Sequence, residues 1–292
     1  MADKTLYQKK IRLGDGLLKG SIYAAAALTF TVLLGLMGYL LVRGLPHISW
    51  GFLSHTYSET DPQQNGILPM LLNTLYVVGI TVLIAGPVGI ASAVYLTQYA
   101  KQGRFVAIVR FAAEVLSGIP SILFGLFGYT VFCQLLRLGT SLLAGCLTMA
   151  LCVLPTLIRT TEEALLSVPR LYTQGAMALG AGKLRVILGI LLPNAMPGIL
   201  TALVLTMGRI VGESAALLFT AGMSYGMPRG VFSHAMESGR TLTLHLYQTA
   251  REAATPDAMN VAFGTAAVLL ILIFLLNRIA WLLGKVLKKG ES

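Results

Sequence analysis

Residues Glu162 to Gly198 read EEALLSVPRLYTQGAMALGAGKLRVILGILLPNAMPG, a stretch of mixed polarity between segments that are apolar enough to cross a bilayer. Within it we predict a short helix from Leu171 to Leu179. Gly180, together with Gly182, is expected to end this helix, because glycine takes the left-handed conformation that a helix C-terminus needs.

The charges that follow the glycines indicate which side of the membrane holds this loop. Lys183 and Arg185 favour the cytoplasmic side. After them, Leu192-Pro193 and Pro197-Gly198 are expected to break the chain as it re-enters the membrane. A short cytoplasmic helix framed by two spans is a surface that another protein can hold.

Composition indicates a polytopic membrane protein. Hydrophobic residues make up 55% of the chain and charged residues 12%, which is about half the charge of a soluble domain. Of the 22 Lys and Arg residues, 16 fall in segments assigned to the cytoplasm and 5 in outward loops, so both termini are expected in the cytoplasm. The net charge of +10 is therefore explained by topology, and no basic reading face for nucleic acid is evident.

Six segments are long and apolar enough to span a membrane as helices, and none shows the short alternating pattern of a β-barrel strand. We therefore predict an all-α fold. The chain divides into residues 1–66, which hold a cytoplasmic segment, the first span and an outward loop, and a core of residues 67–292 with the cytoplasmic loop at 162–192. The predicted spans are Ser21 to Val42, Ile67 to Leu96, Phe111 to Leu135, Thr140 to Ile158, Leu192 to Ala221 and Met259 to Leu283.

The fifth predicted span contains a buried charge, in the sequence ILTALVLTMGRIVGESAALLFTA. Arg209 and Glu213 are four residues apart, which would place them on one helical face. Gly208 and Gly212 form a G-x-x-x-G that would let another helix approach. An arginine inside a span costs at least about 2.5 kcal/mol and tends to face a wet cavity or the bundle interior.

The donor fork of Arg209 fits a tetrahedral oxyanion, so Arg209 and Glu213 are our candidates for the substrate pathway. Glu213 would neutralise Arg209 or accept the proton of a hydrogen phosphate. The alternative is a structural Arg–Glu pair that only holds helices together. Arg110 and Glu114 have the same spacing near the membrane edge, where we expect a pair on the surface of one helix.

The cytoplasmic loop resembles the EAA loop of ABC-importer permeases, whose pattern is Glu-Ala-Ala, three residues, Gly, nine residues and Ile-x-Leu-Pro. Gly180 takes the glycine position, Ala176 the last alanine, and Ile190 to Pro193 the end of the pattern. Gln174 and Gly175 replace the usual Glu and Ala. The resemblance implies a coupling helix that sits in a groove of an ATPase, with Gln174 to Lys183 as the coupling segment.

Three further segments resemble phosphate-specific ABC importer permeases, and the stretches TLHLYQTA and MNVAFGTAAVLL resemble the PstA-type subunit. The family usually continues Gly-Glu-Thr-Ala-Pro where this chain has Gly212 to Ala216, so without the proline we expect a straighter helix beyond Glu213. The segments are NGILPMLLNTLYVVGITVLIAGPVGIASAVYLTQYA, RFAAEVLSGIPSILFGLFG and GRIVGESAALLFTAG.

The resemblance implies a type I ABC importer transmembrane domain in a bacterial inner membrane, surrounded by lipid. It implies a PstC-like permease as the other half of the pore, an ATPase dimer that binds ATP and magnesium, an extracytoplasmic phosphate-binding protein and a PhoU-like regulator. Arg209 and Glu213 would line the phosphate route. The alternative is a permease for another oxyanion, molybdate or sulfate.

We expect no catalysis, cofactor or metal site in this chain. GAMALGAGK, from Gly175, lacks the P-loop spacing and no strand precedes it. The three cysteines lie in apolar surroundings and read as small buried residues, and the four histidines do not cluster as ligands. A secondary transporter would need an inverted repeat, and an intramembrane enzyme would need a nucleophile and base, and neither pattern is evident.

Overall fold

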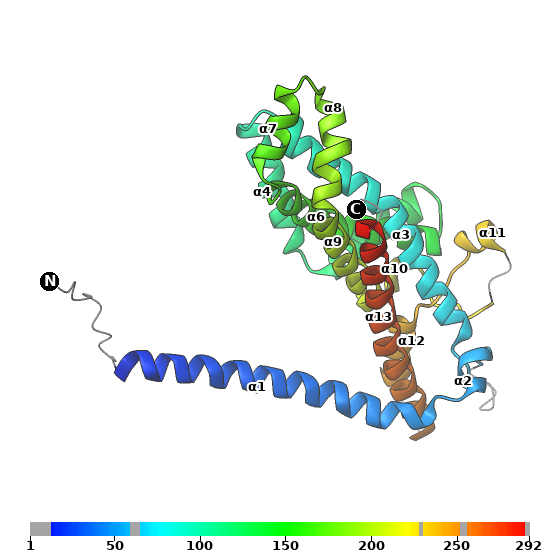
Figure 1. Cartoon of the computed structure of the whole chain (residues 1–292). Helices are drawn as coiled ribbons and strands as arrows, with labels where there is room; N and C mark the ends of the chain where they lie inside the picture. Colours follow the sequence, from blue (N-terminus) through cyan, green and yellow to red (C-terminus); the bar gives the residue numbers. More distant parts are fainter. Residues whose placement is uncertain (1–12, 59–64, 228–229, 252–255, 290–292) are drawn as a thin grey trace.

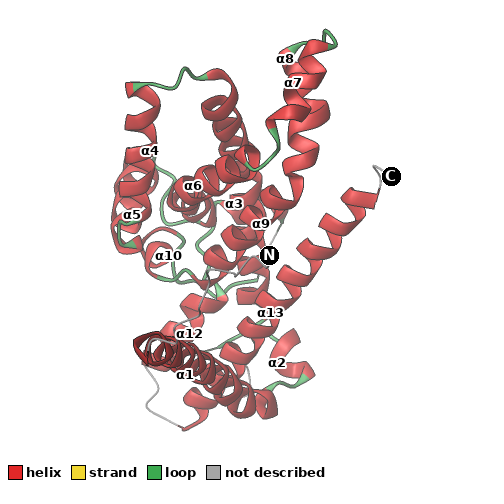
Figure 2. Ribbon diagram, turned by 60° about the vertical axis from the view of Figure 1, so that its left-hand side comes forward, coloured by secondary structure: helices red, strands yellow, loops and turns green. Residues whose placement is uncertain are grey.

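The computed structural model describes residues 13–58, 65–227, 230–251 and 256–289, and its regular structure is helical apart from one antiparallel bridge between Tyr57 and Asn65 (Figures 1 and 2). The all-α prediction is confirmed. The N-terminal basic residues before Leu13, and Arg229, lie outside the described residues. The α-helices are α1 (Leu13–Gly44), α2 (Trp50–Ser54), α3 (Leu68–Val94), α4 (Arg104–Ser117), α5 (Ser121–Gly128), α6 (Leu142–Leu166), α7 (Arg170–Ala178), α8 (Lys183–Val186), α9 (Leu192–Gly212), α10 (Ala215–Thr220), α11 (Val231–Ala235), α12 (Leu242–Arg251) and α13 (Pro256–Lys289).

Five helices in the described ranges are long and apolar enough to cross a membrane, and α4 with α5 gives a sixth crossing if that bent pair is one span. The bend between them is 101°. Pro120 explains it, because proline removes a helix hydrogen bond and forces the preceding residue out of the helical region. The third predicted span is thus a broken one.

The fifth span begins earlier than predicted. Helix continues from Lys183 to Gly212, with a π-helical turn over Ile187–Leu191. Pro193 lies in the first turn of α9, where a missing N–H costs little, and Pro197 lies inside the helix without ending it. The predicted breaks at these two prolines are therefore wrong.

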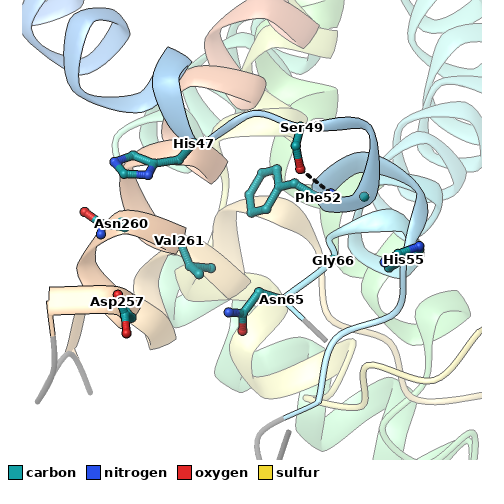
Figure 3. Close-up of a pocket in the computed structure, with 10 residues that line it drawn as sticks. His47, Ser49, Phe52, His55, Asn65, Gly66, Asp257, Asn260 and Val261 are labelled. Atoms are coloured by element: carbon teal, nitrogen blue, oxygen red, sulfur yellow. Dashed lines mark hydrogen bonds between the residues drawn. The ribbon is translucent and has the colours of Figure 1, made fainter. Parts of the chain in front are cut away.

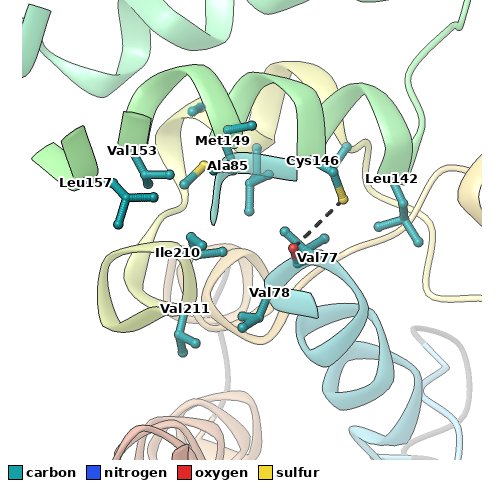
Figure 4. Close-up of a cluster of buried hydrophobic side chains, with 14 of the residues drawn as sticks. Val77, Val78, Ala85, Leu142, Cys146, Met149, Val153, Leu157, Ile210 and Val211 are labelled. Atoms are coloured by element: carbon teal, nitrogen blue, oxygen red, sulfur yellow. Dashed lines mark hydrogen bonds between the residues drawn. The ribbon is translucent and has the colours of Figure 1, made fainter. Parts of the chain in front are cut away.

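Helix α6 is the centre of the bundle and packs against α3, α4, α5, α9 and α10. Small residues allow these contacts: a side chain at Gly128 would lie 2.0 Å from Thr148 Oγ1, and one at Gly125 would lie 2.9 Å from Ala216 Cα. All three cysteines are buried, as predicted. The main core joins α3, α6 and α9 through Val77, Val78, Ala85, Leu142, Cys146, Met149, Val153, Leu157, Ile210 and Val211 (Figure 4).

Helix α1 projects away from the bundle and approaches it only near its C-terminal end, where it packs on α13 (Figure 1). None of its most apolar 18-residue window is buried. The contact is close because Gly44 has no side chain: a Cβ there would lie 2.6 Å from Ala267 Cβ. The rings of Tyr39 and Phe263 meet edge to face beside it.

The segment between α10 and α13 is partly helical, with α11 and α12, and buried polar contacts join it to the bundle. His234 Nε2 lies 2.6 Å from Asn73 Oδ1, and Asn73 Nδ2 donates to the Arg240 carbonyl at 3.1 Å. Thr74 Oγ1 accepts from the Leu242 amide at 2.8 Å. This segment and α2 lie at the opposite end of the bundle from α7 and α8 (Figures 1 and 2).

Candidate functional site

Arg209 lies in the last turn of α9, and both ends of its guanidinium contact α6. Nη1 donates to Thr156 Oγ1 at 3.2 Å and Nη2 to Cys152 Sγ at 3.5 Å. Cys152 and Thr156 are one turn apart and flank the middle of α6, which places Arg209 deep in the membrane part of the bundle. The side chain is half-buried.

Arg209 has no carboxylate partner among the residues that the structure describes, where the recorded ion pairs all involve other residues. Thr156 and Cys152 are neutral and offer only a hydroxyl and a thiol. An arginine at this depth is costly unless an anion or water reaches it. The hydrogen bonds recorded for this guanidinium in the described residues therefore go only to neutral groups of α6.

Glu213 lies just beyond the end of α9, so the prediction that it shares a helical face with Arg209 is wrong, and none of the ion pairs recorded among the described residues joins the two. The helix ends at Gly212, and the backbone of Glu213 is extended, with φ −81° and ψ 128°. Its Oε1 accepts from the Ala216 amide at 3.2 Å and so satisfies an open donor at the start of α10. This local bond stabilises the break without a proline, so the straighter helix expected beyond Glu213 is also wrong.

The glycines of the G-x-x-x-G do not mark a helix contact inside this chain. A Cβ on Gly208 or Gly212 would meet no atom within 4 Å in the described structure. Gly212 is exposed and Gly208 half-buried. The prediction that they admit a neighbouring helix is wrong for the bundle as it stands.

Arg110 and Glu114 do not pair with each other either. Arg110 Nη2 lies 3.2 Å from Glu162 Oε1, and Arg159 Nη1 lies 3.8 Å from Glu114 Oε1. Arg159 also pairs with Glu163 at 3.4 Å. The charges therefore join α4 to α6 across a small cavity of about 260 Å³ near the end of α6 that leads into α7.

Helix α7, Arg170–Ala178, matches the predicted coupling helix to within one residue at each end. Gly180 ends it in the left-handed conformation, with φ +85°. The Ala181 amide donates to the Ala176 carbonyl at 3.0 Å and the Gly180 amide to the Met177 carbonyl at 2.9 Å, which is the Schellman pattern. Gly182 has a different role from the one predicted, because it is the residue that precedes α8.

The surface of α7 is open. Gln174 and Gly175 are exposed and Ala176 is half-buried. Large apolar side chains are also exposed at this end: Leu179 is 91% exposed and Leu171 78%. Exposed apolar side chains therefore lie at both ends of α7.

Lys183, by contrast, turns toward the bundle. Its Nζ lies 4.5 Å from the centre of the Tyr99 ring, at the end of the π-helical turn Tyr95–Tyr99 that follows α3. Lys183 is itself exposed, so this contact connects the open surface around α7 to the end of the second span.

A second polar hollow, of about 460 Å³, opens at the other end of the bundle, between the segment before α3 and the start of α13 (Figure 3). The histidines lie on opposite sides of it, and no group of three potential metal ligands occurs in the described ranges. It is lined by His47, Ser49, Gly51, Phe52, His55, Asn65, Gly66, Asp257, Asn260 and Val261.

Residues 85–289 match the family described as "Binding-protein-dependent transport system inner membrane component". The chain belongs to this family. The permease is 33% identical over 289 residues to the probable ABC transporter permease protein YqgI of Bacillus subtilis, with 95% of this chain and 97% of that protein covered. It is 31% identical over 265 residues to the phosphate transport system permease protein PstA of Haemophilus influenzae, with 89% and 90% covered.

Solved structures show the same fold at lower identity. The permease matches a chain of a bacterial alginate ABC transporter, crystallised with an alginate pentasaccharide-bound periplasmic protein, with a TM-score of 0.66 and 15% identity over 95% of this chain and 99% of that one. It also matches a chain of the MetNI methionine ABC transporter, with a TM-score of 0.57 and 19% identity, and the match covers 79% of this chain and 99% of that one. The fold is that of a type I ABC importer transmembrane domain, and the permease is a multi-pass inner-membrane subunit.

Two residues of the Arg209 site were missed from sequence, Thr156 and Cys152. Each looked like an ordinary small residue in an apolar helix. Their spacing of four shows that they share a face. Nothing in the sequence shows that this face of α6 meets α9 at Arg209.

Proposed function

We propose that this permease forms half of the translocation pathway of an ATP-driven inorganic phosphate importer. Several relatives that align with most of this chain are named as phosphate transport permeases, including the Haemophilus influenzae protein. The proposal rests on one observation: the guanidinium of Arg209, on α9, contacts the middle of α6 and has no carboxylate partner among the described residues. Its fork can bind two oxygens of a tetrahedral oxyanion.

Glu213 would line the same route from the other side of the helix break. One carboxylate oxygen holds the Ala216 amide, and the second would accept the proton of a hydrogen phosphate. Such a contact favours an oxyanion that still carries a proton at neutral pH. Sulfate lacks one, so this arrangement supports phosphate.

The permease itself would not hydrolyse ATP. ATP and magnesium would bind to a partner ATPase dimer, and the coupling segment Gln174, Gly175, Ala176 and Gly180 would seat in a groove of that dimer. The exposed apolar side chains of Leu171 and Leu179 support this, because they leave a surface that a partner would cover. Motion of the ATPases would then bias the bundle between its two openings.

The remaining partners follow from the same proposal. A second, PstC-like permease would complete the pore, an extracytoplasmic phosphate-binding protein would deliver the anion, and a PhoU-like protein would connect transport to regulation. Both termini would lie in the cytoplasm on the side of α7. Lys183 and Arg185 at that end support this orientation.

Reconstitution of the complete complex in proteoliposomes tests the proposal through ATP-dependent entry of labelled phosphate, with and without this permease. Arg209→Ala should reduce uptake at least 100-fold while the complex still co-purifies, and Arg209→Lys should retain the charge but lose bidentate binding. Arg137→Ala, in an exposed turn, is the matched control and should transport at the parental rate. Parental uptake by Arg209→Ala would rule out the pathway role.

A permease for molybdate or sulfate is the alternative, and competition distinguishes it. Excess molybdate or sulfate should leave uptake of labelled phosphate unchanged. Strong competition by either anion, with saturable uptake of that anion, would favour the alternative.

A further inference from the structure

We propose that Thr156 is a second contact for the translocated anion, on α6, and that it also positions the guanidinium of Arg209. This inference rests on the proposed function, because it names a further residue of the same site. It starts from the distance of 3.2 Å between Arg209 Nη1 and Thr156 Oγ1.

The hydroxyl of Thr156 behaves differently from those of Thr148 and Thr160 on the same helix. Thr148 donates to the Ala144 carbonyl at 2.8 Å, and Thr160 donates to the Thr156 carbonyl at 2.8 Å. Threonines in helices commonly donate to the carbonyl four residues earlier in this way. Thr156 instead accepts from Arg209, and its own hydroxyl hydrogen has no recorded acceptor within the described residues.

A hydroxyl can accept one hydrogen bond and donate another at the same time. Thr156 Oγ1 accepts from the guanidinium, so its hydrogen is available to an anion bound beside Arg209. A hydroxyl donor without an acceptor is costly in an apolar membrane interior, whereas it is ordinary where an anion or water passes. Thr156 and Arg209 are both half-buried, which is consistent with a face that a small polar solute reaches.

The neighbouring thiol explains how the fork becomes available to the anion. Arg209 Nη2 donates to Cys152 Sγ at 3.5 Å, and a thiol sulfur is a weak acceptor. An oxyanion oxygen is a far stronger acceptor for a guanidinium N–H, because that bond is charge-assisted. The anion would therefore replace Cys152 at Nη2, while Thr156 keeps Nη1 in place and donates to a second anion oxygen.

The test compares three variants in the reconstituted complex, with saturating phosphate and binding protein. Thr156→Val keeps the shape and removes the hydroxyl, and it should lower ATP-driven uptake by roughly 10- to 100-fold, as expected for one lost hydrogen bond to a charged group. Thr156→Ser keeps the hydroxyl and should restore most of the rate. Thr160→Val, one turn along α6, removes a hydroxyl that bonds only its own helix and should transport at the parental rate.

The outcomes separate this inference from the proposed function. Parental uptake by Thr156→Val, with Arg209→Ala inactive, would overturn the role of Thr156 and leave the function standing. Parental uptake by both Thr156→Val and Arg209→Ala would refute the proposed function as well. Equal loss in Thr156→Ser and Thr156→Val, or in Thr160→Val, would show that shape or packing matters rather than this hydroxyl.

A labelling experiment keeps the inference testable if Thr156→Val does not assemble. Thr156→Cys is placed in a chain whose native cysteines, Cys133, Cys146 and Cys152, are changed to alanine. A negatively charged methanethiosulfonate should modify this residue during turnover, and inorganic phosphate should slow the reaction. Absence of labelling during turnover, or a labelling rate that phosphate leaves unchanged, would overturn the inference.

Discussion

The ammonium group of Lys183 lies 4.5 Å from the centre of the Tyr99 ring, and this contact joins the first residue of α8 to the end of the second span. Helix α7 has no buried residue, and the chain after it continues as helix from Lys183 into the bundle. We infer that this pair helps to transmit movement of the loop to α3.

Tyr99→Leu should lower the amount of phosphate taken up per ATP hydrolysed by about two- to fivefold, which corresponds to a cation–π interaction of about 0.5–1 kcal/mol at a half-exposed site. Tyr99→Phe keeps the aromatic face and serves as the control. The measurement is uptake and ATP hydrolysis in the same proteoliposomes. An identical ratio in all three proteins would exclude transmission through this pair.

Gly180→Ala should weaken the end of the coupling helix. The φ of +85° at Gly180 costs an L-residue about 1–2 kcal/mol, although a Cβ there meets no atom within 4 Å. We expect ATP hydrolysis to continue while uptake falls several-fold. Gly79→Ala, in α3 and outside the coupling segment, has equally open space and should not uncouple the two activities. Loss of coupling in Gly79→Ala but not in Gly180→Ala would contradict the argument.

Arg110→Ala should destabilise the permease by about 1–3 kcal/mol, because Glu162 would lose its partner. The side chain of Glu162 is 9% exposed, whereas that of Arg110 is 41% exposed, so water offsets part of the cost. Arg159→Ala removes pairs with Glu114 and Glu163 that are largely exposed, and it should cost under about 1 kcal/mol. Thermal unfolding in detergent compares the two, and a larger shift for Arg159→Ala would refute the ranking.

His245 should make the permease sensitive to acid. Burial first, and then the nearby charge of Arg240, lower the pKa of His245 from 6.5 to about 3, and both ring nitrogens are buried with no hydrogen-bond partner in the part of the chain that the structure describes. The unfolded chain therefore binds a proton that the folded chain does not. Stability is full above about pH 6.5 and is lost as the pH falls from there toward 3, by about 2 kcal/mol at pH 5.

His245→Leu should remove this part of the acid sensitivity. The unfolding temperature at pH 7 and pH 5 is the measurement, and His55→Leu, at an exposed position, is the control that should keep the parental difference. If the His245→Leu protein lost as much stability between the two pH values as the parental protein, the acid sensitivity would have another source.

Local sequence signals predicted the coupling helix well. The position of α7 follows from Gly180, whose left-handed conformation is a property of glycine itself, and the departure is one residue at each end. The broken third span was also foreseeable in part, because Pro120 acts on the residues beside it. In both cases the residue that determines the structure lies within the element.

Contacts between helices were not predictable in the same way. A spacing of four suggested Arg209–Glu213 and Arg110–Glu114 pairs, yet both arginines bond to α6 instead. Spacing describes neighbours on one helix only, whereas the approach of α6 depends on how the whole bundle packs. The break after Gly212 was missed for a related reason, since the bond from Glu213 to the Ala216 amide replaces the effect expected of a proline.

The interruption of the fifth span has a consequence for hydration. Backbone that leaves the helix at this depth is tolerated only where protein or water satisfies it. Here the Val211 carbonyl accepts the hydroxyl of Thr243, from α12 in the outward segment. A movement of α12 away from α9 would remove the protein donor of the Val211 carbonyl, and water would then have to replace it. Movement of the outward segment and hydration of the region beside Arg209 would therefore occur together.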